Sequence, residues 1–333
     1  MPSPPSIYGV NGLFGSRSII VVFGDSLTQR GYDQDGWVST LSRHYSRRAD
    51  VINRGYGGFN TRWGKVAMYN LFKGPSFWDI FSKMVASDKD KYLTAVIWFG
   101  ANDAAAENMN PHVPIIEYGS NLQDMIDHLK KFFVYIVVMT PPPVHGPTRL
   151  QFQRDQYGDK ATGIEERNTI TAGHYASMAK RIAEANNVLL LDIWTLMLSE
   201  GEEAWPRLVG AGVPGGDGLH LSPVGQQYVA KHLIDLLEVN TVRAEEIPQE
   251  LPWGRDMSPT HFIATMNTYQ THTESRKIGQ GKQFLLMSCP QYVSGAIHYT
   301  IGSLGAISFF LVVFSVARLV AGRNGYRQYG HSE

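Results

Sequence analysis

The sequence predicts an α/β fold in which a doubly wound parallel sheet is buried between layers of helices. Short apolar runs rich in β-branched residues recur between Ser18 and Trp194, and segments with the period of an amphipathic helix lie between them. Strands that alternate with helices form βαβ units, which pair their strands in parallel. Such a sheet is covered on both faces, so its strands are continuous apolar runs.

Five runs are predicted as strands because each is short and is bounded by turn-forming or polar residues. They are 18–23, 50–54, 94–99, 133–139 and 188–194. Helical periodicity is clearest in residues 115–132 and 166–185. A final helix is predicted after Ser222, which can cap it, with Pro223 at its first position.

The chain divides by composition into five segments. They are an N-terminal arm (1–17), the globular domain (18–239), an irregular extension rich in Pro, Gly and polar residues (240–298), an apolar segment (299–320) and a basic tail (321–333). With 333 residues, of which 43% are hydrophobic, the chain can build a substantial core.

The apolar segment is predicted as a single transmembrane helix, Tyr299–Val320. Residues 283–317 contain no Asp, Glu, Lys or Arg, and a helix of about 20 apolar residues spans a bilayer core. Arg318 can reach the membrane interface from the end of this helix. A buried core helix is the alternative, because Gly302 and Gly305 dilute the hydrophobicity. As a span, the segment meets membrane lipid, and its small residues favour packing against helices of partner membrane proteins.

The charge balance and the cysteine content argue against several classes of function. Thirty basic residues match thirty acidic ones, so no basic surplus indicates a nucleic acid partner. The single cysteine, Cys289, cannot form an internal disulfide, and the sequence shows no Asn-x-Ser/Thr acceptor and no secretory signal. The glycine pattern at 210–215 follows no strand and contains Pro214, and metal-binding motifs are absent from the sequence. We therefore expect neither a dinucleotide cofactor nor a metal.

Polar residues and glycines follow the predicted strands at the sheet edge where α/β proteins bind ligands. Ser26 in GDSLTQ follows the first strand, Gly55, Gly57 and Gly58 follow the second, and Asn102 in FGANDA follows the third. A serine here can act as a nucleophile, glycines let backbone N–H groups approach a ligand, and an amide can donate to an oxyanion. Each signal taken alone is more often a helix cap or a turn.

Asp217 and His220 stand three residues apart, just before the last predicted helix. This spacing lets the carboxylate reach the imidazole within one local turn, hold its tautomer and stabilise its charged form. A nucleophile, oxyanion donors and an acid-base unit, all at one edge of a sheet, are the parts that acyl transfer needs.

The four segments resemble the sequence blocks of the SGNH (GDSL) hydrolase family. The matching stretches are GDSLTQ, NRGYGGFNTRW, GANDAA and DGLHLSPVG. NPHVPIIEY, MTPPPV and LDIWTLM are similar to the isoamyl acetate-hydrolysing esterase branch, and the resemblance covers residues 18–239. It implies a flavodoxin-like three-layer α/β/α sandwich with a five-stranded sheet. It also implies serine-dependent hydrolysis of small, short-acyl esters without metal or cofactor.

The resemblance implies a role for each site residue. Ser26 attacks the ester carbonyl, His220 carries the proton, and Asp217 orients His220. The backbone N–H groups of Ser26 and Gly58 and the side-chain amide of Asn102 form the oxyanion hole. Gly58 is preferred to the neighbouring glycines because it precedes FNT, as the glycine of the family's pattern does.

Three polar residues near these positions are interpreted as structural. Asp25 and Asp103 are expected to brace their loops through hydrogen bonds rather than act on substrate. His112, in NPHVP, is expected to be a loop residue rather than a ligand.

Two functions of different classes are consistent with the chain. The first is a membrane-anchored serine esterase, which the complete constellation favours. The second is an accessory subunit of a membrane protein complex with an SGNH fold and little or no turnover, which the long C-terminal region favours. Arginines after the apolar segment and the missing secretory signal indicate an intracellular membrane, with the mitochondrion as one candidate.

Overall fold

The structure, a computed structural model, describes residues 17–71, 93–161, 163–247, 249, 253–257 and 260. The predicted membrane helix at 299–320 and the basic tail lie outside these residues. Among the helices that the structure does describe, none combines the length and the apolar character that crossing a membrane requires.

A parallel sheet of five strands forms the centre of the described part. The strands are β1 (Ser18–Gly24), β2 (Ala49–Gly55), β3 (Leu93–Trp98), β4 (Tyr135–Met139) and β5 (Leu189–Leu191), in the order β2-β1-β3-β4-β5. The chain reverses its direction of travel across the sheet between β1 and β3, which is the switch point where doubly wound proteins bind ligands. The predicted α/β class and the five parallel strands are confirmed.

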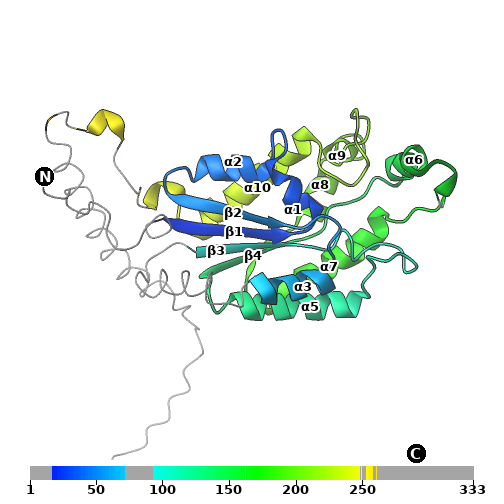
Figure 1. Ribbon diagram of the computed structural model, residues 1–333, viewed down its shortest axis with the longest axis horizontal. Helices are drawn as coiled ribbons and strands as arrows, with labels where there is room; N and C mark the ends of the chain where they lie inside the picture. Colours follow the sequence, from blue (N-terminus) through cyan, green and yellow to red (C-terminus); the bar gives the residue numbers. More distant parts are fainter. Residues whose placement is uncertain are drawn as a thin grey trace, which may run out of the picture. The chain divides into compact units, whose positions relative to one another are not determined.

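Helices cover both faces of the sheet (Figure 1). One face carries α2 (Trp37–His44), α8 (Ile193–Ser199), α9 (Trp205–Leu208) and α10 (Pro223–Asn240), and the other carries α3 (Thr61–Leu71), α5 (Ile115–Leu129) and α7 (Thr169–Ala185). Strand β1 supplies both cores, because Ile20 and Val22 pack toward the first face while Val21 and Phe23 pack toward the second. All four side chains are at most 1% exposed, which explains why β1 is a continuous apolar run.

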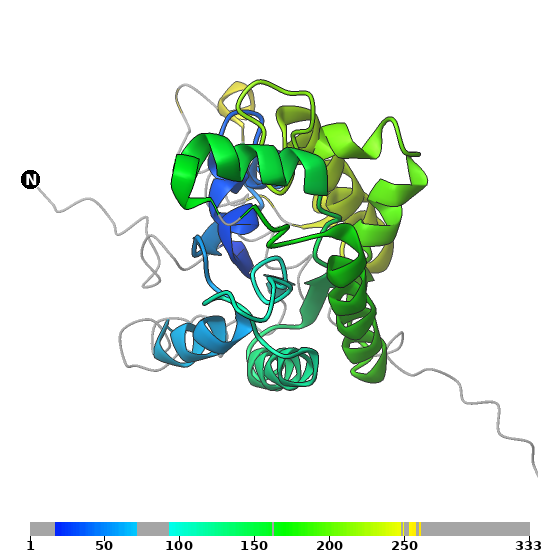
Figure 2. The same ribbon diagram turned by 90° about the vertical axis from the view of Figure 1, so that its right-hand side faces the viewer.

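Two elements lie beyond the carboxyl ends of the strands. These are the short helix α1 (Ser26–Gln29), directly after β1, and α6 (Gly146–Tyr157), after β4. Figure 2 looks onto this edge of the sheet and shows α6 lying across it. Both elements therefore lie at the edge of the sheet where doubly wound proteins bind ligands.

Side-chain caps explain where the observed elements depart from the predicted ones. The fifth strand ends at Leu191 instead of Trp194, because the Asp192 side chain accepts a hydrogen bond from the Thr195 N–H and starts α8. Helix α7 begins at Thr169, where the Asn168 side chain caps it. The predicted cap of the last helix is confirmed, because the Ser222 side chain accepts a hydrogen bond from the Gly225 N–H at 3.1 Å.

The hydrophobic core continues past Val239, the predicted end of the domain. Ala244 and Ile247 are 8% and 2% exposed and belong to the core beside α10. Arg48 donates hydrogen bonds to the carbonyls of Glu245 and Ile247, which fastens this segment to the turn between α2 and β2. The predicted boundary therefore leaves out two core residues, while the division of the remaining chain stays a prediction.

Candidate active site

Ser26 lies at the point where the chain leaves the centre of the sheet. Strand β1 ends at Gly24, and a Cβ atom added there would lie 2.4 Å from the Trp98 carbonyl oxygen, so only glycine fits. The Asp25 side chain accepts a hydrogen bond from the Leu27 N–H at 2.9 Å and turns the backbone into α1. In the described part, the Ser26 N–H has no acceptor, as expected at the first position of a helix.

His220 joins Ser26 to Asp217. Its Nε2 lies 2.8 Å from the Ser26 Oγ, and its Nδ1 lies 2.6 Å from the Asp217 Oδ2. A carboxylate only accepts hydrogen bonds, so Nδ1 carries the proton and Nε2 is left to accept one from the serine. The structure thus brings together three residues that are up to 194 positions apart in the chain.

The turn that presents His220 is fixed by its own backbone. Oδ1 of Asp217 accepts hydrogen bonds from the N–H groups of Leu219 at 3.0 Å and His220 at 2.8 Å. Gly218 has a φ of +75°, and an added Cβ would lie 2.6 Å from the His145 carbonyl oxygen, so this position requires glycine. Burial alone would raise the pKa of Asp217, but the hydrogen bonds and charge of His220 and the two N–H groups lower it below its usual range.

A buried arginine that the sequence analysis missed also binds Asp217. Arg149 of α6 donates from Nη1 to the Asp217 Oδ2 at 2.9 Å, so this oxygen accepts from both the arginine and the histidine. Arg149 and Asp217 are 8% and 5% exposed. The sequence offered no signal for this pair, because the partners are 68 positions apart.

Asn102 is held by hydrogen bonds at both ends of its carboxamide. Its Nδ2 donates to the Phe59 carbonyl at 2.9 Å, and its Oδ1 accepts from the Arg167 Nη2 at 3.1 Å. Because a guanidinium can only donate, Arg167 fixes which end of the amide is the oxygen. The second Nδ2 hydrogen is left to donate elsewhere. Arg167, which is buried and also binds the Ala101 carbonyl at 3.0 Å, is the second functional candidate that sequence reasoning missed.

Gly58 occupies a backbone conformation that favours glycine. Its φ is +78°, the residue is exposed, and its N–H donates to no acceptor among the described residues. The neighbouring Gly57 differs, because its N–H donates to the Gln29 Oε1 at 2.6 Å. Of these two glycines, Gly58 therefore has the backbone donor available to a ligand.

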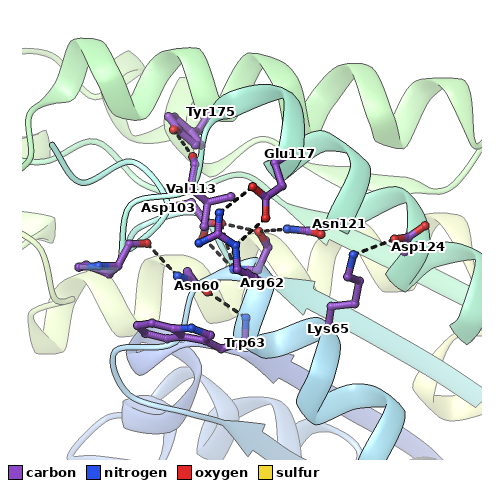
Figure 3. A network of polar contacts seen from close by, with 12 residues as sticks. Asn60, Arg62, Trp63, Lys65, Asp103, Val113, Glu117, Asn121, Asp124 and Tyr175 are labelled. Atoms are coloured by element: carbon purple, nitrogen blue, oxygen red, sulfur yellow. Dashed lines mark hydrogen bonds and ion pairs between the residues drawn. The ribbon is translucent and has the colours of Figure 1, made fainter. Parts of the chain in front are cut away.

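Asp103 ties the loop after β3 to the start of α3 (Figure 3). Its carboxylate accepts hydrogen bonds from the Thr61 N–H at 3.0 and 3.1 Å and from the Thr61 hydroxyl. Asn121 of α5 donates to the same hydroxyl at 3.2 Å, and Arg62 forms a two-pronged ion pair with Glu117 at 2.6 Å. These contacts hold the loop after β2, which contains Gly58, next to the loop after β3, which contains Asn102.

The two aspartates beside the serine and the asparagine brace their loops, as predicted. Burial raises the pKa of Asp25 and of Asp103 to about 7. Asp25 is fully buried, and its Oδ2 has no hydrogen-bond partner in the described part of the chain. His112 lies in a turn, as expected, with its Nδ1 2.7 Å from the Ala105 carbonyl oxygen.

The arrangement is suited to acyl transfer. The Ser26 hydroxyl is hydrogen-bonded to the His220 imidazole, which is hydrogen-bonded to the buried Asp217 carboxylate. Among the described residues, three hydrogen-bond donors are not fully used: the N–H groups of Ser26 and Gly58 and the side-chain amide of Asn102. Within the residues that the structure describes, no group of three or more His, Cys, Asp or Glu side chains is placed to hold a metal ion. The catalytic roles of the individual residues remain predictions.

Known proteins resemble this chain over the same region. The family model described as GDSL-like Lipase/Acylhydrolase matches residues 20–233. A GDSL esterase/lipase of Arabidopsis thaliana is 33% identical over 241 residues, which cover 71% of this chain and 92% of the relative. The isoamyl acetate-hydrolyzing esterase 1 homolog of Bos taurus is 33% identical over 244 residues, covering 72% of this chain and 88% of the relative.

Among solved structures, the lipase/acylhydrolase from Enterococcus faecalis is similar with a TM-score of 0.48 and 23% identity, covering 67% of this chain and 96% of its own. The family assignment rests on the sequence matches instead. The family model spans more than half of the chain and includes all five predicted site residues. The chain therefore belongs to the GDSL-like lipase/acylhydrolase family and is a carboxylic ester hydrolase of the SGNH type.

Proposed function

We propose that this protein is a serine esterase that hydrolyses small carboxylic esters with short acyl groups. The observation that carries the proposal is the continuous chain of contacts from Ser26 through His220 to Asp217, at 2.8 and 2.6 Å. The names of several relatives, isoamyl acetate-hydrolyzing esterase 1 homologs at about 32% identity, support a short acyl group and a small alcohol.

In the proposed reaction, the Ser26 Oγ bonds to the ester carbonyl carbon while His220 Nε2 takes the hydroxyl proton. Asp217 stabilises the imidazolium that forms. The carbonyl oxygen becomes an oxyanion, which accepts hydrogen bonds from the Asn102 amide and the N–H groups of Ser26 and Gly58.

Collapse of this intermediate breaks the bond to the alcohol oxygen, and His220 returns the proton to the departing alcohol. A water molecule then repeats the sequence on the acyl-serine and releases the carboxylic acid. Apart from the ester and the water molecule, this cycle uses groups that the chain itself provides.

The test is hydrolysis of p-nitrophenyl acetate, butyrate and octanoate, and of isoamyl acetate, by the purified chain. We expect kcat/KM to fall as the acyl group lengthens, and Ser26→Ala to abolish both turnover and labelling by a fluorophosphonate. Ser199→Ala is the matched control, because Ser199 is exposed at the end of α8. Labelling that persists in Ser26→Ala would contradict the assignment of the nucleophile.

We further propose that the C-terminal region anchors the esterase to an intracellular membrane. The family match ends at residue 233, and the apolar segment 299–320 lies well beyond it. The full-length chain should stay in membranes through alkaline carbonate washing, and microscopy of a tagged chain should show the organelle, with the mitochondrion as the first expectation. Extraction by carbonate would contradict the anchor.

The same C-terminal region supports the second function, an accessory subunit of a membrane complex. About 100 residues follow the matched region, more than a single span needs. Mild detergent extraction separates the two functions. A subunit would migrate with fixed partners and lack ester turnover, whereas an anchored esterase would migrate alone and hydrolyse p-nitrophenyl acetate.

A further inference from the structure

Helix α6 lies at the periphery of the fold but contacts the acid-base pair of Asp217 and His220. The N-cap residue of α6, His145, donates its backbone N–H to the Gly218 carbonyl at 2.8 Å. Gly218 lies in the turn that holds Asp217 and His220. One turn into the helix, the Arg149 guanidinium reaches the Asp217 carboxylate at 2.9 Å. The Phe152 ring lies 5.1 Å from the guanidinium carbon and packs against it.

Arg149 fills the last acceptor position of a carboxylate that already has three donors. Oδ1 of Asp217 accepts two backbone N–H groups, and Oδ2 accepts His220 Nδ1 together with Arg149 Nη1. Charge-assisted hydrogen bonds of this kind are about twice as strong as neutral ones. They also fix direction, so Asp217 cannot rotate without losing contacts from both sides.

The guanidinium also changes the electrostatics of proton transfer. In a triad whose carboxylate is otherwise unpaired, the imidazolium formed during reaction is the only cation beside the buried carboxylate. Here a permanent cation binds the same oxygen as His220. It offsets part of the carboxylate charge that would otherwise stabilise the imidazolium.

We propose that Arg149 is a positioning residue of the triad, which orients Asp217 and sets how readily His220 takes up the Ser26 proton. The proposal rests on the proposed esterase mechanism. Other charged or titratable groups near the triad are Arg167, Glu166, Asp25, His145 and Glu165. The variants at Arg149 and Arg154 leave all of these residues in place.

The experiment compares Arg149→Met, Arg149→Lys and, as a matched control, Arg154→Met, which lies exposed on the same helix. Two quantities are measured across pH in the full-length chain: the rate of Ser26 labelling by a fluorophosphonate, and the protonation of His220 followed by NMR of ¹⁵N-labelled histidine. Circular dichroism checks that each variant is folded. The NMR measurement does not depend on ester turnover. A failure of the proposed esterase function can therefore be distinguished from a failure of the proposed role of Arg149.

For Arg149→Met we expect labelling at the plateau to slow by about 10- to 100-fold, because losing the charge-assisted hydrogen bond that orients Asp217 outweighs the easier proton uptake by His220. We also expect protonation of His220 to move to higher pH. Arg149→Lys keeps the charge and should restore the wild-type pH dependence, although not the full rate. Arg154→Met should match the wild type in both.

Unchanged protonation of His220 in a folded Arg149→Met chain would overturn the proposal, whether or not labelling slows. A slower rate alone would show that Arg149 only supports the packing of α6. If Arg149→Met fails to fold, Arg149→Lys decides: a pH dependence displaced from that of the wild type would refute the role of the positive charge.

Discussion

Replacing Asp25 by asparagine should make the protein more stable at alkaline pH. Burial raises the pKa of this carboxyl from its ordinary value of 3.8 to about 7. In the unfolded chain the proton is lost near the ordinary value, whereas the folded chain keeps it until the pH reaches about 7. The folded state thus binds more protons across this window, and its stability falls as pH rises through it.

The size of the effect follows from the two pKa values. A difference of one pKa unit between the folded and unfolded states corresponds to about 1.4 kcal/mol. The difference between 3.8 and about 7 therefore means that ionisation of Asp25 in the fold costs about 4 kcal/mol in total. About 3 kcal/mol of this is incurred between about pH 5 and about pH 8. Asp25→Asn keeps the oxygen that accepts the Leu27 N–H and removes the ionisation. The variant should therefore gain about 3 kcal/mol relative to wild type across that interval.

The assay is urea unfolding at several pH values, followed by the fluorescence of the buried Trp37 and Trp98. Asp159→Asn, on an exposed turn, serves as the control and should run parallel to the wild type. Parallel curves for Asp25→Asn and the wild type would refute the reasoning, because they would mean that Asp25 ionises at the same pH in both states. Asp103, whose pKa is raised in the same way, keeps its own pH dependence in both proteins.

Three further changes test the site and the core. Asn102→Ala should lower kcat by about 100- to 1000-fold with KM within a few-fold, since in the proposed mechanism the amide donates mainly in the transition state; a change confined to KM would place Asn102 in substrate binding instead. Arg167→Met should lower kcat by about tenfold because the amide loses its orientation, and adding it to Asn102→Ala should cost nothing more; additive losses would refute this link. Ile247→Ala should reduce the free energy of unfolding by about 2 to 4 kcal/mol in urea titrations, as for other buried isoleucines, whereas Val239→Ala, 82% exposed, should not; equal effects would contradict the burial of Ile247.

The fold was predictable because its strands are local apolar runs between turns. The same holds for the Asp217–His220 unit, which a single turn brings together, and for the Ser222 cap. Errors appeared where a polar side chain decided the end of an element. Asp192 ends β5 by capping the next helix, although the apolar residues Ile193 and Trp194 follow it in the sequence.

Helix α6 and the core residue Ile247 could not be found by periodicity. The buried positions of α6 are Gly146, Arg149 and Gln153, so the helix has no apolar stripe for a pattern to detect. Ile247 lies in a mostly polar segment, and it is buried in a core formed largely by residues distant in the sequence. Periodicity in the sequence detects an apolar face of a helix or strand, and neither α6 nor the segment around Ile247 has such a face.

Buried polar and charged side chains fix several of the predicted site residues at this edge of the sheet. Arg149 holds Asp217, Arg167 holds Asn102, and Asp25 turns the chain at the serine. The two arginines cost free energy to bury, and this cost is offset only when their hydrogen-bond partners are in place. Loss of Arg149 would leave the buried Asp217 carboxylate with one hydrogen-bond donor fewer, so the geometry of the site is coupled to folding. Substitutions here should therefore fall into two kinds: those at Asp25, which remove a carboxyl that ionises at a cost in the fold, and those at Arg149 and Arg167, which leave Asp217 or Asn102 without a hydrogen-bond partner.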